Sequence, residues 1–176
     1  MVDKYIKVEG YGVKGRKIST QLVAPIRSWK GKGRVMAFVG TYDHTLDAKG
    51  RLVLPSKFRG YFADAAYLSP GDGCVALRTP DDFNEMVERF QEEVRSKDAD
   101  PKALKRLVTW SEEVRPDAQG RIMVPARLQL LAGLDREIVV CGVIDRIEIW
   151  NAASWNEMAD ELDQSLASAF RQGSGI

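Results

Sequence analysis

Apolar and polar residues alternate along several short stretches of the chain, a pattern typical of half-buried β-strands. The clearest stretch is residues 38–46, where β-branched and aromatic side chains alternate with polar ones. Turn-forming residues such as Pro70-Gly71-Asp72-Gly73 separate neighbouring apolar runs. These runs predict further strands at residues 52–54, 67–69, 74–78, 114–115, 121–124, 137–141 and 146–150.

Two longer segments repeat their apolar residues every three to four positions, which predicts amphipathic helices. The first follows Thr79 as N-cap with Pro80 at its first position, and the second follows Asn151 and continues to about Phe170. Shorter helices are predicted at residues 56–62 and 126–132 and from Asp100 onward. The apolar faces would pack on the core or on another subunit; they consist of Phe83, Met86, Val87, Phe90 and Val94 in the first long helix and Trp155, Met158, Ala159, Leu162 and Leu166 in the second. The fold class expected is therefore α+β.

The pattern occurs twice. The segment DAKGRLVLP at residues 47–55 returns as DAQGRIMVP at residues 117–125, and the apolar series of the long helices returns at nearly the same offset. Such repetition indicates a duplicated supersecondary unit. We expect one unit at residues 36–100, a linking helix at 101–111, a second unit at 112–170, and a frayed tail at 171–176.

Each copy of the repeated segment has the residues of a tight turn. Gly50 and Gly120 can supply a positive φ, and Asp47 and Asp117 can accept hydrogen bonds from the amides of the turn, so these four residues are predicted to shape the loops. The arginine that follows, four residues after the aspartate, has two possible roles. It either braces the hairpin as a weak surface ion pair, or presents a guanidinium to guanine or phosphate.

The two motifs in register resemble those of the MraZ family, over essentially residues 36–170. The resemblance implies a duplicated swapped-hairpin core like that of AbrB and MazE, wrapped into a β-barrel with short helices and two longer outer helices. It also implies a transcriptional regulator that binds double-stranded DNA at tandem repeats upstream of its own gene, in the division and cell-wall cluster. Such proteins assemble as rings, so a homo-oligomer is expected, located in the cytoplasm and associated with the nucleoid.

The same resemblance assigns DNA contacts to the loop residues. The assignment falls on Lys49 and Arg51, with Arg59 nearby, and on Arg121 in the second copy. Gln119 stands in the second loop where the first has Lys49, so the two halves need not contribute equally. Lysine in such a loop is expected to contact phosphate rather than to select a base.

Net charge adds a condition to this interpretation. The overall charge is +1, but residues 1–35 carry nine Lys or Arg against Asp3 and Glu9, so the rest of the chain is negative. DNA binding through the loops would therefore require a local basic patch on an acidic background. The basic run at residues 30–34, just before Met36, is interpreted as a translated ribosome-binding site that precedes the true start; a basic arm that grips DNA is the alternative.

Other kinds of site find little support in the sequence. Cys74 and Cys141 lie in apolar runs and are interpreted as small core residues, and His44 is the only histidine. We therefore expect no metal, no cofactor and no small-molecule substrate. No stretch has the roughly 20 consecutive apolar residues of a membrane span, so no membrane partner is expected.

The sequence leaves two rival functions to consider. The repeated aspartates could form a catalytic carboxylate pair, but a cation adjacent to each would lower both pKa values and remove the shared proton, so no enzyme activity is expected. The stronger rival is an antitoxin-like or scaffold protein that binds a protein partner through its acidic helices, which carry Asp81, Asp82, Glu85, Glu88, Glu92, Glu93, Glu157, Asp160, Glu161 and Asp163.

Overall fold

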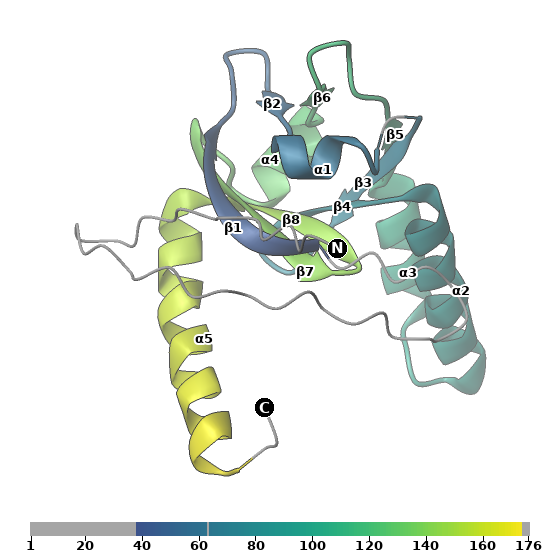
Figure 1. Cartoon of the computed structure of the whole chain (residues 1–176). Helices are drawn as coiled ribbons and strands as arrows, with labels where there is room; N and C mark the ends of the chain where they lie inside the picture. Colours follow the sequence, from purple (N-terminus) through teal and green to yellow (C-terminus); the bar gives the residue numbers. More distant parts are fainter. Residues whose placement is uncertain (1–37, 63, 174–176) are drawn as a thin grey trace, which may run out of the picture. The chain divides into compact units, whose positions relative to one another are not determined.

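The computed structural model describes residues 38–62 and 64–173, which belong to the second of the two units into which the chain divides, Met36–Ile176. The predictions for residues 1–35, including a start at Met36, lie outside the described residues. The described part is an α+β fold with an antiparallel six-stranded sheet, a two-stranded sheet and five helices (Figure 1). The α+β class is confirmed.

The elements follow one another in the predicted order. They are β1 (Phe38–Thr45), β2 (Arg51–Val53), α1 (Ser56–Arg59), β3 (Ala66–Pro70), β4 (Val75–Arg78), α2 (Pro80–Ser96), α3 (Pro101–Trp110), β5 (Glu112–Val114), β6 (Arg121–Met123), α4 (Ala126–Leu131), β7 (Glu137–Ile144), β8 (Arg146–Asn151) and α5 (Ala152–Arg171). Helix α1 is shorter than predicted, and β7 is longer.

The three longest helices begin at the predicted caps. The Thr79 hydroxyl accepts a hydrogen bond from the amide of Asp82 at 3.2 Å, and the Asp100 carboxylate accepts one from the amide of Lys102 at 2.8 Å. The Asn151 side chain accepts hydrogen bonds from two amides in the first turn of α5. Each cap satisfies amide groups that have no partner within the helix.

Strand pairing crosses between the two copies. Strand β2 pairs with β6 rather than forming a regular hairpin with β1, and an isolated bridge links Leu46 to Leu52 at the base of the first hairpin. Strand β1 pairs with β7 over eight residues. The six-stranded sheet runs in the order β1-β7-β8-β4-β3-β5 and is open, with β1 and β5 at its edges, so the expected closed barrel is not observed.

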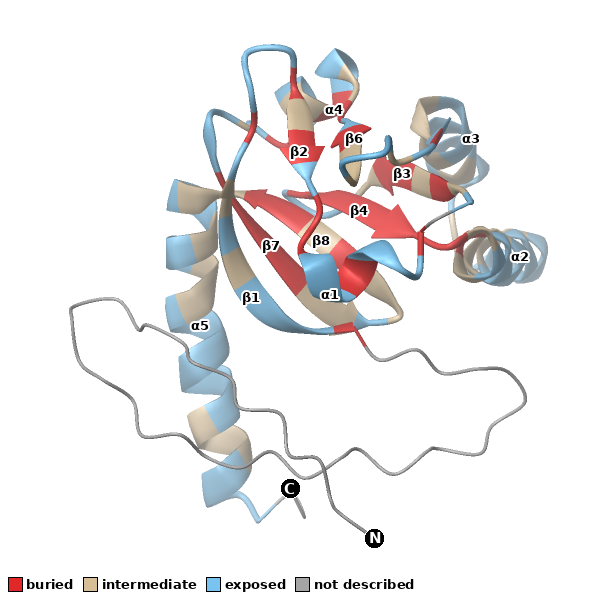
Figure 2. Ribbon diagram, turned by 45° about the horizontal axis from the view of Figure 1, so that its top comes forward, coloured by how far each residue is buried: buried red, intermediate tan, exposed pale blue. Residues whose placement is uncertain are grey.

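The main core lies between the six-stranded sheet and the β2–β6 ribbon (Figure 2). Both copies supply it from equivalent positions. The three equivalent pairs, each residue at most 1% exposed, are Leu52 with Ile122, Leu54 with Val124, and Phe58 with Leu128. Burial at matched positions means that the two copies complete one shared core instead of two separate ones.

The long helices cover the sheet only in part. Helices α2 and α3 lie at the β3–β4 end, and the first half of α5 packs against β7 and β8, while its second half extends beyond the sheet (Figure 1). Phe83 is the one buried residue of α2, and Leu162 and Leu166 of α5 are 50% and 48% exposed. The apolar faces were expected to pack on the core or on another subunit. For the second half of α5, packing on the core of the same chain is therefore wrong.

A smaller cluster lies under the start of α5. Trp155 and Met158 pack there against Cys141 and Trp150, with Cys74 in the same cluster. Both cysteines are free, and burial raises the pKa of each thiol to about 12. Their interpretation as core residues is confirmed. Among the described residues, no helix is both long and apolar enough to span a membrane.

Candidate nucleic-acid interface

The loop that joins β1 to β2 is held by one aspartate. Oδ1 of Asp47 accepts hydrogen bonds from the amides of Lys49 at 2.8 Å and Arg51 at 3.0 Å, and Oδ2 accepts one from Nε of Arg51 at 2.6 Å. The amide of Gly50 donates to the carbonyl of Asp47 at 2.8 Å, which closes the turn. A single carboxylate thus fixes both the loop backbone and the position of the arginine side chain.

The loop that joins β5 to β6 repeats this geometry. Oδ1 of Asp117 accepts from the amides of Gln119 at 2.9 Å and Arg121 at 3.0 Å, and Oδ2 accepts from Nε of Arg121 at 2.7 Å. The amide of Gly120 donates to the carbonyl of Asp117 at 2.8 Å. Equivalent bonds differ by at most 0.1 Å between the loops, so the duplicated sequence builds two copies of one device.

Two features of each loop require its glycine. Gly50 and Gly120 both have a φ of +73°, which side-chain-bearing residues rarely adopt. A Cβ on Gly50 would also collide with Nε2 of Gln129, and one on Gly120 would come within 2.6 Å of Cδ of Arg59. Each glycine therefore permits both the turn and the close approach of a side chain from the other copy.

Each loop is braced by the opposite copy, which the sequence analysis missed. Nε of Arg59 donates to the carbonyl of Leu54 at 2.7 Å while its side chain lies against Gly120. At the equivalent position, Nε2 of Gln129 donates to the carbonyl of Val124 at 2.6 Å beside Gly50. The offset of 70 residues between Arg59 and Gln129 was the available signal, but the side chains differ and gave no sign of a common role.

Backbone hydrogen bonds join the two copies at the same place. The amide of Leu54 donates to the carbonyl of Gly120 at 2.9 Å, and the amide of Val124 donates to the carbonyl of Gly50 at 2.9 Å. Together with the pairing of β2 and β6, these two bonds tie each loop to the chain segment that follows the other loop. The two loops consequently project from the same end of the molecule (Figure 1).

The aspartates remain ionised at neutral pH. The backbone hydrogen bond from Arg51 is the main reason that the pKa of Asp47 lies below its ordinary value, and the one from Arg121 has the same effect on the pKa of Asp117. The arginine side-chain contacts add to the lowering. A carboxylate stabilised in this way is poorly suited to sharing a proton with a second one, so the geometry offers no support for the catalytic pair.

The loop side chains face solvent rather than the core. Lys49 and Gln119 are exposed at the tips, and the side chains of Arg51 and Arg121 are 32% and 30% exposed. Each ion pair is made through Nε, which is one of the five N–H donors that a guanidinium carries. The structure therefore places Lys49, Gln119, Arg51 and Arg121 at one accessible end, with Arg59 beneath the second loop.

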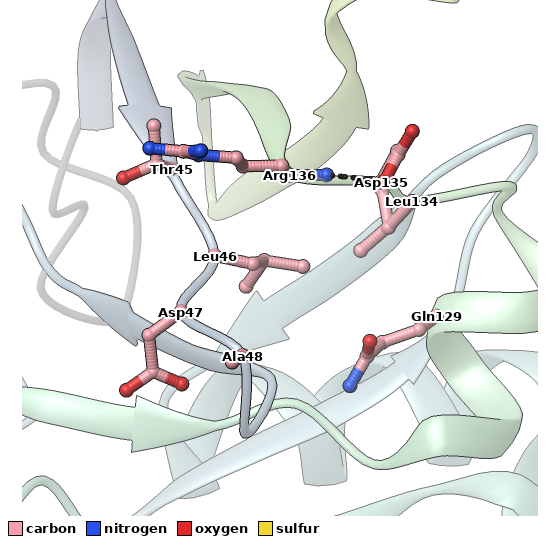
Figure 3. A pocket seen from close by; sticks show the side chains of 8 residues that line it. All are labelled: Thr45, Leu46, Asp47, Ala48, Gln129, Leu134, Asp135 and Arg136. Atoms are coloured by element: carbon pink, nitrogen blue, oxygen red, sulfur yellow. Dashed lines mark hydrogen bonds between the residues drawn. The ribbon is translucent and has the colours of Figure 1, made fainter.

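An open cavity of about 530 Å³ lies beside the first loop (Figure 3). Leu46 projects from the first copy toward Leu134 and Gln129 of the second, and Asp135 and Arg136 also line the cavity. The amide of Leu46 donates to the carbonyl of Arg136 at 2.9 Å, which ties the base of the loop to the second copy. No set of three or more His, Cys, Asp or Glu that could hold a metal occurs in residues 38–62 and 64–173.

Comparison with known proteins identifies the family. A family model described as "MraZ protein, putative antitoxin-like" matches the chain twice, at residues 37–106 and 108–173. A protein named transcriptional regulator MraZ from Saccharopolyspora erythraea is 38% identical over 133 residues, which cover 75% of this chain and 93% of the relative. One of the same name from Mycoplasmoides gallisepticum is 35% identical over 138 residues, covering 72% of this chain and 97% of the relative. The resemblance in the two loop motifs is thus confirmed, and the chain belongs to the MraZ family.

Proposed function

We propose that this chain is a transcriptional regulator that binds double-stranded DNA through its two loops. The observation that carries the proposal is the pair of matching loops at one end, each presenting an arginine held by its own aspartate. Holding a side chain in place before binding lowers the entropy lost on binding. The names of the two relatives support a role in transcription. At the loops Lys49, Arg51, Arg59 and Arg121 outnumber Asp47 and Asp117, and the acidic helices lie on other parts of the fold.

The roles of the loop residues follow from their chemistry. Arg51 and Arg121 can donate two hydrogen bonds to O6 and N7 of guanine, or to a phosphate. Lys49 binds phosphate as a point charge, whereas Gln119 can pair with N6 and N7 of adenine. Arg59 supports the second loop and adds positive charge there. The loops are shaped by Asp47, Gly50, Asp117 and Gly120. These residues hold the side chains that contact DNA in position and do not contact DNA themselves.

We further propose that the chain acts as a homo-oligomer, shaped as a ring, on tandem DNA repeats. Leu162, Leu166 and Phe170 form an exposed apolar stripe on the free half of α5, which suits contact with another subunit. Repeating a weak loop contact around an oligomer raises the effective concentration of each further contact. The repeats would lie upstream of the chain's own gene, in the division and cell-wall cluster, and the protein would be cytoplasmic and associated with the nucleoid.

The finer architecture is part of the same proposal. The pairing of β2 with β6 supports a swapped-hairpin, AbrB-like core made of two units, residues 36–100 and 112–170, joined by residues 101–111. The tail is residues 171–176. No enzymatic activity and no cofactor are included, because the loop carboxylates are already engaged by amides and arginines.

An antitoxin-like or scaffold function is the second candidate. Helix α2 supports it, because exposed Glu85, Glu88, Glu92 and Glu93 give it an acidic surface suited to a basic protein partner. The description of the matching family also contains the term antitoxin-like. In this case the loops would be incidental to binding.

Equilibrium binding to a duplex from the region upstream of the reading frame separates the two candidates. Arg51→Ala and Lys49→Ala should each weaken binding by more than about 1 kcal/mol, and rising salt should weaken it further. Arg95→Ala is the matched control, since Arg95 also pairs with an exposed carboxylate, Glu92 at 2.9 Å, but on α2. Loop variants that bind the duplex as tightly as the wild type would favour the antitoxin-like function, in which the acidic surface of α2 contacts a protein partner.

A further inference from the structure

The outer face of the β2–β6 ribbon carries two apolar side chains that the loop arginines flank. Val53 is 39% exposed and Met123 is 47% exposed, whereas their strand neighbours Leu52 and Ile122 are buried. Side chains alternate between the two faces of a strand, so residues two apart share a face. The outer face of the ribbon therefore carries Arg51, Val53, Arg121 and Met123.

The strand register makes these four side chains a compact patch. Arg51 lies opposite Met123, and Val53 lies opposite Arg121. Opposite residues on one face are about 5 Å apart and diagonal ones about 7–8 Å, so the patch spans roughly two base-pair steps of about 3.4 Å. A two-stranded ribbon of this kind fits the major groove of B-DNA.

We propose that Val53 and Met123 are specificity-determining residues that read the C5-methyl group of thymines next to the bases contacted by Arg51 and Arg121. The inference rests on the DNA binding proposed for the loops and extends it to the ribbon between them. The major groove offers hydrogen-bonding groups to a guanidinium, but the thymine methyl is its one apolar feature. Val53 has no hydrogen-bonding side-chain group and Met123 only a weak acceptor, so a methyl group is the surface that they match.

Charge favours DNA over a second copy of the chain as the occupant of this patch. If two copies packed ribbon to ribbon, the four guanidinium groups would gain no anion beyond the aspartates that already pair with them. A duplex instead brings phosphates to the arginines and methyl groups to the apolar pair. The stripe of Leu162, Leu166 and Phe170 lies on α5, far along the chain from this patch, and is a separate apolar surface that suits subunit contact.

The test uses a duplex from the region upstream of the reading frame and a second duplex in which deoxyuridine replaces every thymidine. This replacement removes the C5-methyl and keeps Watson–Crick pairing. Binding is measured for the wild type, Val53→Ser and Met123→Gln. Val39→Ser is the matched control, because Val39 is also a strand valine with 39% exposure but lies on β1.

We expect the wild type to bind the deoxyuridine duplex about three- to tenfold more weakly, as loss of buried methyl contacts implies. Val53→Ser and Met123→Gln should each bind the normal duplex more weakly by a similar factor. Their affinity should fall less than that of the wild type when the methyl groups are removed. Such non-additivity identifies groups that contact each other. Val39→Ser should bind normally and keep the full sensitivity to deoxyuridine.

The possible failures are distinguishable. If Arg51→Ala loses binding while Val53→Ser and Met123→Gln respond to both duplexes like the wild type, methyl reading is overturned and loop binding stands. If the wild type binds neither duplex, or Arg51→Ala binds normally, both proposals fail. If either ribbon variant changes the sedimentation of the free protein, the patch is a subunit contact and the inference is overturned. Far-UV circular dichroism checks that each variant is folded.

Discussion

The two loops have the same backbone and differ at their tips and supports. In both loops an aspartate accepts hydrogen bonds from two backbone amides and from one arginine Nε, and a glycine with a φ of +73° completes the turn. The tip is Lys49 in one and Gln119 in the other, and the brace from the opposite copy is Gln129 under the first loop and Arg59 under the second. Turn geometry thus constrains Asp and Gly, while the exposed tip residues and the residues that support the loops differ between the copies.

The largest effect should come from the shared core beneath both loops. Leu52→Ala and Ile122→Ala should each lower the free energy of unfolding by about 2–5 kcal/mol, because both sites are fully buried and equivalent. Urea denaturation measures the loss, with Leu130→Ala as the control, since Leu130 is 85% exposed. A loss at only one of the two sites would show that the copies do not share one core.

The glycines should come next. Gly50→Ala and Gly120→Ala should each destabilise by about 2–3 kcal/mol, from left-handed strain of about 1–2 kcal/mol and disturbance of the bracing hydrogen bond, worth about 1 kcal/mol. Gly133 provides the control, because its φ of +56° imposes similar strain while a Cβ there would meet nothing within 4 Å. Equal losses at all three sites, measured by denaturation, would argue against the bracing contacts.

Exchanging the tips should alter DNA binding by less. Lys49→Gln should lower the slope of log affinity against log salt by about one, and Gln119→Lys should raise it by about one, if each lysine neutralises one phosphate. Titrations of the upstream duplex at several salt concentrations give the slopes. An unchanged slope in both variants would mean that the tips do not reach phosphate, whatever the arginines contact.

The smallest effect should be on pH dependence. His44 precedes the first loop where the second copy has Val114, and partial burial lowers its pKa below the ordinary 6.5. A histidine whose pKa is lowered by folding contributes stability that is complete above about pH 6.5 and is lost as pH falls from 6.5 through the lowered pKa of the folded state. Between pH 8 and pH 5 the melting temperature of the wild type should fall, and it should fall less in His44→Val. An equal fall in the variant would show that other groups cause the pH dependence.

Much of the fold was predictable because the signals are local. Alternation gave the strands, and Thr79, Asp100 and Asn151 gave the helix starts that the structure confirms. The choice of partner was not predictable in the same way, since the alternation in Arg51–Val53 says which face is buried but not that β6 is the neighbour. The period of α5 likewise predicts an apolar face without saying that Leu162 and Leu166 extend past the sheet.

The candidate site was predictable in its turn chemistry and not in its supports. The Asp and Gly positions implied the loop geometry, and the structure has that geometry in both copies. The bracing of Gly120 by Arg59 is a contact between copies, made across a core that only the folded chain assembles. The sequence did not reveal the exposed pair Val53 and Met123 either, because the alternation predicts strands there without predicting that the two strands lie side by side.

Hydrogen–deuterium exchange of the protein with and without the upstream duplex tests the central claim most directly. If the two loops and the ribbon between them form the DNA-binding surface, the duplex should slow exchange at residues 47–53 and 117–123 together and leave the acidic face of α2 unchanged. Protection confined to α2 or α5, with exchange in both loops unaltered, would contradict the account.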